Sequence, residues 1–364
     1  MTSFYSLFHK ITHDEPGYKF LKAVAYGLSG GYFWGLKLHQ WFYKTGWLKQ
    51  KSVPCHTISI GNLVVGGVGK TPFTIFLASL LKNMGRKVMV VSRGYKSQIK
   101  QVVVSDGCRI FLTPLEAGDE GYLLARNLRN IPIIKGENRY QAIMAVFKDF
   151  LPEIIILDDA FQHYALKRDL DIVLLSAYSP FGNGHLLPRG RLREPISALN
   201  RAQAVVITHV KQQNQVKKLK KFLKKRFPDL TVFTANIQIE KIISIQGKEI
   251  EISELSNKCL LAFCGLAEPV YFYQTCKDLN LCVTHFLSYP DHHRYTRKQV
   301  LHLIEIAKKN NIDALITTEK DMVKLLAFSP LFTEANCSVL YPTITMHIHQ
   351  IEAFVSWIKE KLGF

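Results

Sequence analysis

A glycine-rich stretch, GNLVVGGVGKTP at residues 61–72, constrains this chain more than any other feature. It follows the β-branched run TISI and precedes the apolar run PFTIFLASLL, so we expect a strand, a turn and a helix in that order. Gly66, Gly67 and Gly69 allow backbone N–H groups to turn towards an anion at the helix N-terminus. The stretch therefore predicts a phosphate-binding loop in an α/β fold.

Two side chains at the end of this loop supply the chemistry of a nucleotide site. Lys70 can place a positive charge on the terminal phosphates, and the Thr71 hydroxyl can reach a magnesium ion. The strict pattern has a glycine six residues before the lysine, where this chain has Val64. That glycine contributes conformational freedom and no chemical group, so the loop keeps what phosphate binding requires. A plain surface lysine is the alternative interpretation of Lys70.

A pair of adjacent carboxylates follows another predicted strand. The run EIIIL at residues 153–157 is typical of a strand buried on both faces of a parallel sheet, and Asp158 and Asp159 come directly after it. Ligands of open α/β sheets bind at the carboxyl ends of strands, and carboxylate oxygens suit Mg²⁺. Because neighbouring acids repel each other, a metal ion or its water shell is the favoured reason for the pair. A helix N-cap is the alternative for either one.

The length of 364 residues predicts two domains, because one hydrophobic core rarely serves so many residues. We expect a phosphate-loop domain with a parallel sheet at 51–235 and a smaller α/β domain at 236–364, which begins with connector strands that turn at Gly247. A basic amphipathic helix, QVKKLKKFLKKRF, precedes the second domain. The expected strands of the two domains are HTISI, KVMVV, QVVV, IPII, EIIIL, DIVLL and AVVI, then CLLAFC, VTHFL, DALITT and SVLYPTI.

The first 50 residues differ from the rest. The run AVAYGLSGGYFWGL at 23–36 carries no charge but is shorter than the roughly 20 residues that span a bilayer. Aromatic and basic residues lie within and after it, and together they predict a helix at a membrane surface; packing on the protein's own core is the alternative. The expected interfacial residues are Trp34, Trp41, Tyr43 and Trp47 with Lys37, Lys44 and Lys49.

Composition restricts the partners. The chain has 47 Lys plus Arg against 29 Asp plus Glu, a net charge of +18, which favours nucleic acid, acidic lipid or a phosphorylated substrate. Aromatic-basic recognition motifs are missing, so we expect no nucleic-acid partner, and we expect no obligate protein partner. The seven cysteines include no Cys-x-x-Cys pair and are expected to be reduced, as in a cytosolic protein.

The ordered motifs GNLVVGGVGKTP, SRGY, GDE, LDDAFQH, LPRGRLREP, DHHRY and TEKD resemble those of the tetraacyldisaccharide 4'-kinase family. The resemblance runs from the N-terminal apolar helix to the C-terminal domain. It implies transfer of the γ-phosphate of ATP, with Mg²⁺, to the 4'-hydroxyl of tetraacyldisaccharide 1-phosphate, a lipid A precursor. It also implies a P-loop domain, a smaller C-terminal domain and a membrane-associated helix at the cytoplasmic face of the Gram-negative inner membrane.

The resemblance also implies roles for individual residues. Asp119 of the GDE motif becomes the catalytic base, with His292 as its partner, and His293 stays open for that role. From the residues alone, Asp119 is equally the N-cap of the helix that begins there. The implied catalytic residues are Asp119, His292, Lys70 and Arg193; the ATP-binding residues are Gly66, Gly67, Val68, Gly69, Lys70, Thr71, Pro72, Gln162 and His163; the metal ligands are Thr71, Asp158, Asp159 and Glu194.

Two further motifs are open to more than one interpretation. The basic loop LPRGRLREP carries Arg189, Arg191 and Arg193, of which we expect Arg193 first to bind a phosphate oxygen; arginines that are only solvated are the alternative. Lys320 and Asp321 follow a predicted strand, and either contact the substrate or cap a helix.

The chain departs from the usual family pattern at two places. Ala160 and Phe161 replace the Gly-Leu pair of DDGLQH, which should change packing at that turn without removing an oxygen ligand. Ala267 and Glu268 follow the AFCGL turn, and Glu268 places an acid near the expected cleft.

Two other classes of protein share parts of these patterns. Switch-type P-loop ATPases also carry GGVGKT, but they typically have a lysine immediately before the paired glycines, where this chain has Val65. A nucleic-acid-binding NTPase would agree with the positive charge. A requirement for a lipid acceptor separates the kinase from the switch ATPase, and salt-sensitive DNA binding is the expected mark of the nucleic-acid-binding NTPase.

Overall fold

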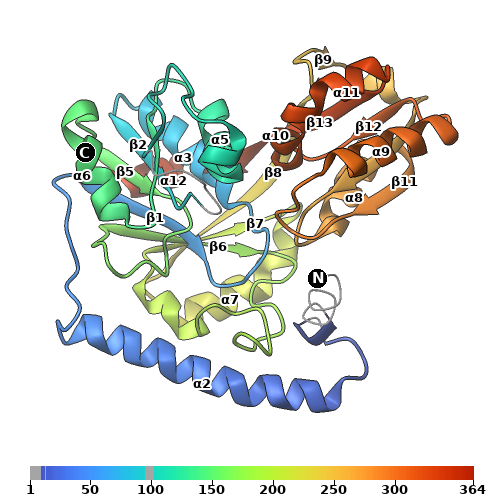
Figure 1. Ribbon diagram of the computed structural model, residues 1–364. Coiled ribbons are helices and arrows are strands. Elements are labelled where there is room, and N and C mark those ends of the chain that lie inside the picture. The colour runs from blue at the N-terminus through green and yellow to red at the C-terminus, as the bar shows by residue number, and fades with distance from the viewer. Residues whose placement is uncertain (1–9, 13, 95–101) are drawn as a thin grey trace.

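The computed structural model describes residues 10–12, 14–94 and 102–364, so Tyr95 of the SRGY motif lies outside the described residues. Thirteen strands of the described chain join in one sheet that continues through both halves of the molecule (Figure 1). Strands form at all of the runs of β-branched residues that predicted them. The predicted α/β fold with a largely parallel sheet is confirmed.

The first half of the sheet has the order β8-β7-β6-β1-β5-β2-β4-β3. Its neighbouring strands are parallel except for β3, which runs antiparallel to β4. The strands are β1 (His56–Asn62), β2 (Val88–Ser92), β3 (Val103–Ser105), β4 (Ile133–Lys135), β5 (Ile154–Leu157), β6 (Leu170–Ser176), β7 (Ala204–Thr208) and β8 (Thr231–Ser244).

Helices cover both faces of this half. α3, α5 and α12 pack on one face, while α6 and α7 pack on the other with a 3-10 helix at Ile196–Arg201. In α3, Phe73, Leu77 and Leu81 recur at helical spacing and are all buried. The bounds are α3 (Lys70–Asn83), α4 (Pro114–Ala117), α5 (Asp119–Asn127), α6 (Arg139–Phe150), α7 (Lys217–Arg226) and α12 (Ile351–Leu362).

The second half of the sheet has the order β11-β10-β12-β13-β8, with β9 paired to β8. α8 lies on one face and α9, α10 and α11 on the other. The turn predicted at Gly247 connects β8 to β9, and Gly247 has a φ of +90°. The elements are β9 (Glu249–Ile250), β10 (Cys259–Cys264), α8 (Pro269–Asp278), β11 (Cys282–Ser288), α9 (Arg297–Lys309), β12 (Ala314–Ile316), α10 (Glu319–Leu325), α11 (Ser329–Glu334) and β13 (Ser338–Ile348).

Strand β8 connects the two halves directly. It pairs in parallel with β7 at residues 231–234 and in antiparallel with β13 at residues 235–244. The boundary expected at 235/236 therefore falls inside one strand. The C-terminal helix α12 then returns to the first half, where the Phe354 ring lies 6.1 Å from Phe73 and 5.0 Å from Phe233. By packing, α12 belongs with the phosphate-loop half.

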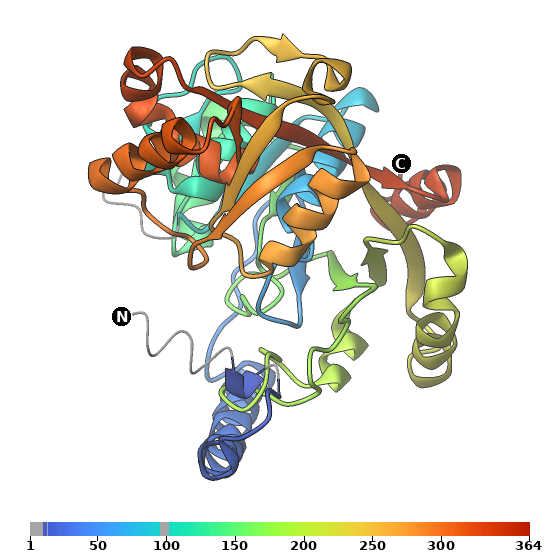
Figure 2. The ribbon, with the colours of Figure 1, turned by 90° about the vertical axis from the view of Figure 1, so that its right-hand side faces the viewer.

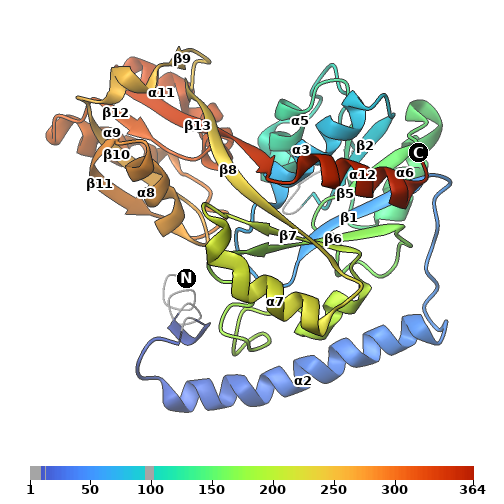
Figure 3. The same ribbon diagram turned by 180° about the vertical axis from the view of Figure 1, so that it is seen from behind.

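Helix α2 (Lys19–Lys44) lies along the outside of the molecule, beneath the 3-10 helix and the α7 side of the sheet (Figure 3). Figure 2 views it nearly end-on, apart from the sheet and its covering helices. Of its 26 residues, Ala25 and Ser29 are buried, whereas Trp34 is 71% exposed. Helix α2 is therefore not packed on the protein's own core, which was the alternative interpretation of this segment. In the described part of the chain, no helix is both long enough and apolar enough to cross a membrane.

Candidate active site

The phosphate loop lies between β1 and α3, as the sequence predicts. Gly66 has a φ of +132° and Gly69 a φ of +81°, a region of backbone conformation that side chains rarely adopt. A Cβ on Gly66 would also collide with the guanidinium of Arg191. Gly69 directly precedes α3, so Lys70 and Thr71 open the helix where its backbone N–H groups are free of intrahelical partners.

Val64 is buried and pairs with Leu192 in an isolated antiparallel bridge. The neighbouring Val65 N–H donates to the Arg191 carbonyl at 2.8 Å, and Arg191 Nη2 donates back to the Val65 carbonyl at 2.9 Å. The start of the phosphate loop is thus held as extended backbone against the LPRGRLREP loop. Because β-branched residues favour extended backbone, this pairing explains why Val64 is tolerated at the position where the strict pattern has glycine.

Two cations of the predicted site meet at one carboxylate. Lys70 Nζ lies 3.7 Å from Asp159 Oδ1, and Arg193 Nη1 lies 2.9 Å from the same oxygen. Burial raises the pKa of Asp159, but the charges of Lys70 and Arg193 outweigh it and leave that pKa below its ordinary value. Lys70 also donates to Asn62 Oδ1 at 3.4 Å.

Asp158 is in a different environment from its neighbour. It is 2% exposed and accepts a hydrogen bond of 3.0 Å from Thr74 Oγ1 on α3. Burial and the nearby charges of Glu120 and Asp159 raise the pKa of Asp158 to about 7. The two adjacent acids therefore differ in how readily they ionise: Asp159 is paired with cations, whereas burial and neighbouring carboxylates disfavour the ionised form of Asp158.

Oxygen donors suited to Mg²⁺ lie on two elements that meet here: Asp158 and Asp159 follow β5, and Thr71 is in the first turn of α3, the helix whose Thr74 contacts Asp158. No group of three His, Cys, Asp or Glu side chains within the described ranges could hold a metal by itself. Mg²⁺ is usually bound by one or two carboxylates together with substrate phosphates and water. The donor set fits a magnesium ion that arrives with a nucleotide.

The turn after Asp159 packs tightly against β1. Gln162 Nε2 donates to the Asn62 carbonyl at 3.0 Å. Phe161 is fully buried, and a Cβ on Gly61 would lie 2.5 Å from the Phe161 Cβ, so Gly61 makes room for this turn. Burial, with the charges of Arg139, Arg168 and Arg93, lowers the pKa of His163 to about 4, which leaves its imidazole neutral.

Glu194 lies in a separate buried network. Its carboxylate, which has no solvent exposure, accepts hydrogen bonds from Arg201 Nη1 at 2.8 Å, Arg201 Nη2 at 3.0 Å, Tyr164 Oη at 2.7 Å and Gln40 Nε2 at 3.2 Å. Because Gln40 belongs to α2, the network ties that helix to the LPRGRLREP loop. These contacts use both carboxylate oxygens, so a structural role accounts for Glu194 without a metal.

Asp119 and His292 meet although 173 positions separate them. His292 Nδ1 lies 3.4 Å from Asp119 Oδ2. The neighbouring His293 instead stacks on Tyr289 at 4.7 Å and contacts Gln299 Oε1 at 3.1 Å, so the geometry selects His292. The N-cap interpretation of Asp119 is wrong, because Gly118 is the N-cap and Asp119 is the first residue of α5.

The electrostatics of Asp119 favour its ionised form. Burial raises its pKa, but the hydrogen bond from His292 and the charge of Lys324 outweigh this and lower the pKa. A small hollow beside it is lined by Gly94, Asp119, Glu120 and His292. A Cβ on Gly121 of α5 would lie 3.2 Å from Ser92 Oγ at the end of β2, and β2 pairs with β5, which Asp158 follows. The start of α5, with Asp119, therefore lies at the same edge of the sheet as the phosphate-loop cluster.

The capping interpretation of the TEKD motif agrees with the start of α10. Thr318 is the N-cap: its Oγ1 accepts from the Asp321 N–H, and its hydroxyl donates to Asp321 Oδ2 at 2.7 Å, while the Gly265 N–H donates to the same oxygen at 2.8 Å. Lys320 Nζ lies 3.2 Å from His292 Nε2. Sequence reasoning missed Thr74, Asn62 and Lys324; only Lys324 had a signal, because it lies four residues after Lys320 on the same helix face.

The site has a phosphate loop with cations for a terminal phosphate, and beside it a carboxylate and an imidazole that can receive a proton. Together these groups supply what is needed to transfer the terminal phosphate of a nucleotide to an acceptor hydroxyl. The fold and the site define the class of P-loop kinases. Within that class, the chain belongs to the tetraacyldisaccharide 4'-kinase family, the ATP-dependent kinases of lipid A biosynthesis: the family model described as Tetraacyldisaccharide-1-P 4'-kinase matches residues 21–363.

Relatives of known name agree with this assignment. The chain is 40% identical over 302 residues to Tetraacyldisaccharide 4'-kinase of Halothermothrix orenii, covering 79% of this chain and 78% of that protein. It is 35% identical over 358 residues to the enzyme of the same name from Desulfatibacillum aliphaticivorans, covering 94% and 91%. Among solved structures, LpxK from Aquifex aeolicus in complex with ATP superposes with a TM-score of 0.74 at 30% identity, covering 94% of this chain and 99% of that one.

Proposed function

We propose that this chain transfers the γ-phosphate of ATP to the 4'-hydroxyl of tetraacyldisaccharide 1-phosphate, giving the 1,4'-bisphosphate of the lipid A pathway. The observation that carries the proposal is the contact between Asp119 and His292 beside the phosphate-loop cluster. A nucleotide switch needs no base for an acceptor hydroxyl, whereas a kinase needs one near the phosphate that it transfers.

Each residue then has a defined task. The backbone of Gly66, Gly67, Val68, Gly69, Lys70, Thr71 and Pro72 surrounds the phosphates, and Gln162 and His163 support the turn beside them. Lys70 and Arg193 bind oxygens of the γ-phosphate and offset the charge that develops on it. Asp119 accepts the proton of the 4'-hydroxyl, while His292 Nδ1–H holds the carboxylate in place.

Thr71, Asp158 and Asp159 would hold Mg²⁺. When bound, the ion would neutralise negative charge on the phosphates. Glu194 is left out of this set, because Arg201, Tyr164 and Gln40 already use its oxygens.

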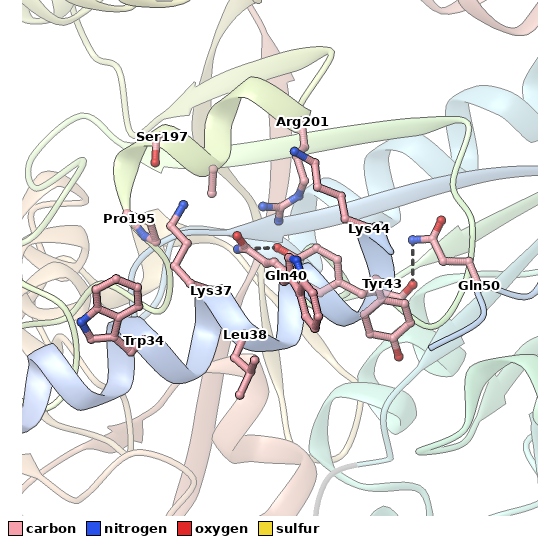
Figure 4. A pocket seen from close by; sticks show the side chains of 13 residues that line it. Trp34, Lys37, Leu38, Gln40, Tyr43, Lys44, Gln50, Pro195, Ser197 and Arg201 are labelled. Atoms are coloured by element: carbon pink, nitrogen blue, oxygen red, sulfur yellow. Dashed lines mark hydrogen bonds between the residues drawn. The ribbon is translucent and has the colours of Figure 1, made fainter. Parts of the chain in front are cut away.

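The proposal places α2 at the cytoplasmic face of the bacterial inner membrane, where the acyl chains of the acceptor can remain in the bilayer. Trp34 and Trp41 are 71% and 49% exposed, and Trp47, just after the helix, is 75% exposed. A cavity of about 740 Å³ separates part of α2 from the 3-10 helix at Ile196–Arg201. Figure 4 shows Lys37 and Lys44 pointing from α2 towards Ser197 and Arg201 on its far wall. Aromatic side chains and cations on one helix suit an anionic membrane surface.

The test is transfer of labelled γ-phosphate from ATP, with Mg²⁺, to a tetraacylated glucosamine disaccharide 1-phosphate in detergent. We expect a labelled lipid that disappears with Lys70→Ala and persists with Lys87→Ala, an exposed lysine outside the site. Asp119→Ala should retain ATP binding and lose turnover. Release of free phosphate without labelled lipid would overturn the proposal in favour of a switch ATPase.

A further inference from the structure

Helix α10 directs two lysines, one helical turn apart, at the pair of Asp119 and His292. Lys320 Nζ lies 3.2 Å from His292 Nε2, and Lys324 Nζ lies 3.6 Å from Asp119 Oδ2. The Lys324 side chain is 6% exposed and that of Lys320 is 20% exposed. Withdrawing ammonium groups from water is costly unless they are paired, so their placement requires a specific explanation.

A second carboxylate also holds Lys324. Its Nζ lies 2.9 Å from Oδ1 of Asp321, a side chain with no solvent exposure. The other oxygen of Asp321 accepts hydrogen bonds from the Gly265 N–H and the Thr318 hydroxyl. A buried and fully oriented carboxylate thus sets the position of the ammonium that faces Asp119.

The contact with Lys320 determines the tautomer of His292. An ammonium has only donors, so the Nε2 that it faces must accept a hydrogen bond, and a neutral imidazole then carries its proton on Nδ1. Nδ1 is the atom that faces the Asp119 carboxylate, which needs a donor. The other charged groups around the pair, Glu120, Asp291 and Asp321, are carboxylates and accept hydrogen bonds. Asp291 Oδ2 lies 3.9 Å from His292 Nε2, which is beyond hydrogen-bond distance, whereas Asp291 Oδ1 lies 3.4 Å from Lys320 Nζ and pairs with that ammonium.

We propose that Lys320 and Lys324 are positioning residues for the phosphate transfer. Lys320 selects the tautomer of His292 that donates from Nδ1, and Lys324 holds the Asp119 carboxylate in the orientation that receives the hydroxyl proton. The inference rests on the proposed base role of Asp119.

The first experiment reads the tautomer directly and needs no substrate. The full-length protein is labelled with ring-¹⁵N histidine, and the His292 signals are identified by their loss in His292→Gln. We expect an unprotonated Nε2 in the wild type and in Lys320→Arg. In Lys320→Met the Nε2–H form should gain population, because no ammonium faces that nitrogen. An unchanged tautomer in Lys320→Met, or the same change in the exposed control Lys309→Met, would overturn the role of Lys320.

The second experiment measures turnover. Misplacing a reacting group by about 1 Å can cost about 100-fold in rate, so Lys324→Met should lower kcat by about 10- to 100-fold and leave the KM for ATP within about twofold. Lys324→Arg should recover part of kcat, because it restores the charge. Wild-type kcat in Lys324→Met, or a loss confined to ATP binding, would overturn its positioning role. A wild-type protein that phosphorylates no lipid overturns the proposed function, whereas an unchanged tautomer in active Lys320→Met protein overturns this inference alone.

Discussion

Arg193 Nη1 lies 2.9 Å and 3.1 Å from the two carboxylate oxygens of Asp159, and Lys70 Nζ lies 3.7 Å from the nearer one. The same carboxylate therefore faces both cations that we assign to the γ-phosphate of ATP. A phosphate that enters this site must share these cations with Asp159 or displace it from them.

Asp159→Asn should strengthen ATP binding when no divalent ion is present. The substitution removes a negative charge beside the triphosphate and releases Lys70 and Arg193 for it, so we expect a Kd lower by about threefold to tenfold. Isothermal titration calorimetry in EDTA measures this, with Asp149→Asn, an exposed acid on α6, as the control. Weaker binding in EDTA would contradict the competition between Asp159 and phosphate.

Glu194→Gln should destabilise the protein. Removing one partner of a fully buried ion pair typically costs about 3–5 kcal/mol, because the other charge is left uncompensated. Here the remaining charge is on Arg201, whose side chain is 27% exposed and can regain some hydration, so we expect about 2–3 kcal/mol. Tyr164→Phe, which removes one hydrogen bond of the same carboxylate, should cost about 1 kcal/mol. Urea denaturation measures both values. Unchanged stability together with a raised Mg²⁺ requirement for turnover would instead support a metal-binding role for Glu194.

The sequence predicted the elements of this fold more successfully than their connections. Runs of Ile, Val and Leu predict buried parallel strands because their patterning is local, as in the segment that became β5. Nothing local shows that β8 passes from one half to the other, or that Phe354 of α12 returns to pack on Phe73. Those contacts depend on residues far apart in the chain.

The same limit applies to the site. The phosphate loop around Lys70 and the two acids after β5 could be predicted from the sequence, because the residues of each motif are contiguous. Sequence spacing could not show that Val64 pairs with Leu192, or that Glu194 forms an ion pair with Arg201. Each contact depends on how segments that are separate in the sequence pack together. The choice of His292 over His293 likewise required the position of α5 relative to the second half of the sheet.

Replacing Trp34 and Trp47 together by serine should weaken binding to vesicles that contain anionic phospholipid. Both side chains are mostly exposed, so their loss should leave thermal stability nearly unchanged. Burying an aromatic side chain in the interface contributes on the order of 1–2 kcal/mol, so the loss of both should lower the partition coefficient by about 30-fold or more. Vesicle co-sedimentation measures this. Val270→Ser, which removes an apolar side chain that is 68% exposed on α8, serves as the control. Equal losses in both proteins would argue against α2 as the membrane-binding element.

His209 gives the protein a pH-dependent stability that one substitution should remove. Its ring stacks on Tyr271 at 5.6 Å, and its Nδ1 lies 3.2 Å from Thr208 Oγ1. Burial lowers the pKa of His209 from 6.5 to about 4, so the folded protein keeps this imidazole neutral.

Because the pKa is lower in the folded state, the unfolded chain binds the proton more readily. The contribution of His209 to stability is complete above pH 6.5 and is lost as the pH falls towards 4. At pH 5 the loss should be about 2 kcal/mol. His209→Asn keeps a polar side chain that tolerates the local φ of +60° but does not titrate, so its free energy of unfolding should fall less between pH 8 and pH 5, by about that amount. His163, whose pKa is also lowered to about 4, is present in both proteins and cancels in the comparison. Urea denaturation at the two pH values measures the difference, and equal losses would show that His209 is not held neutral by burial.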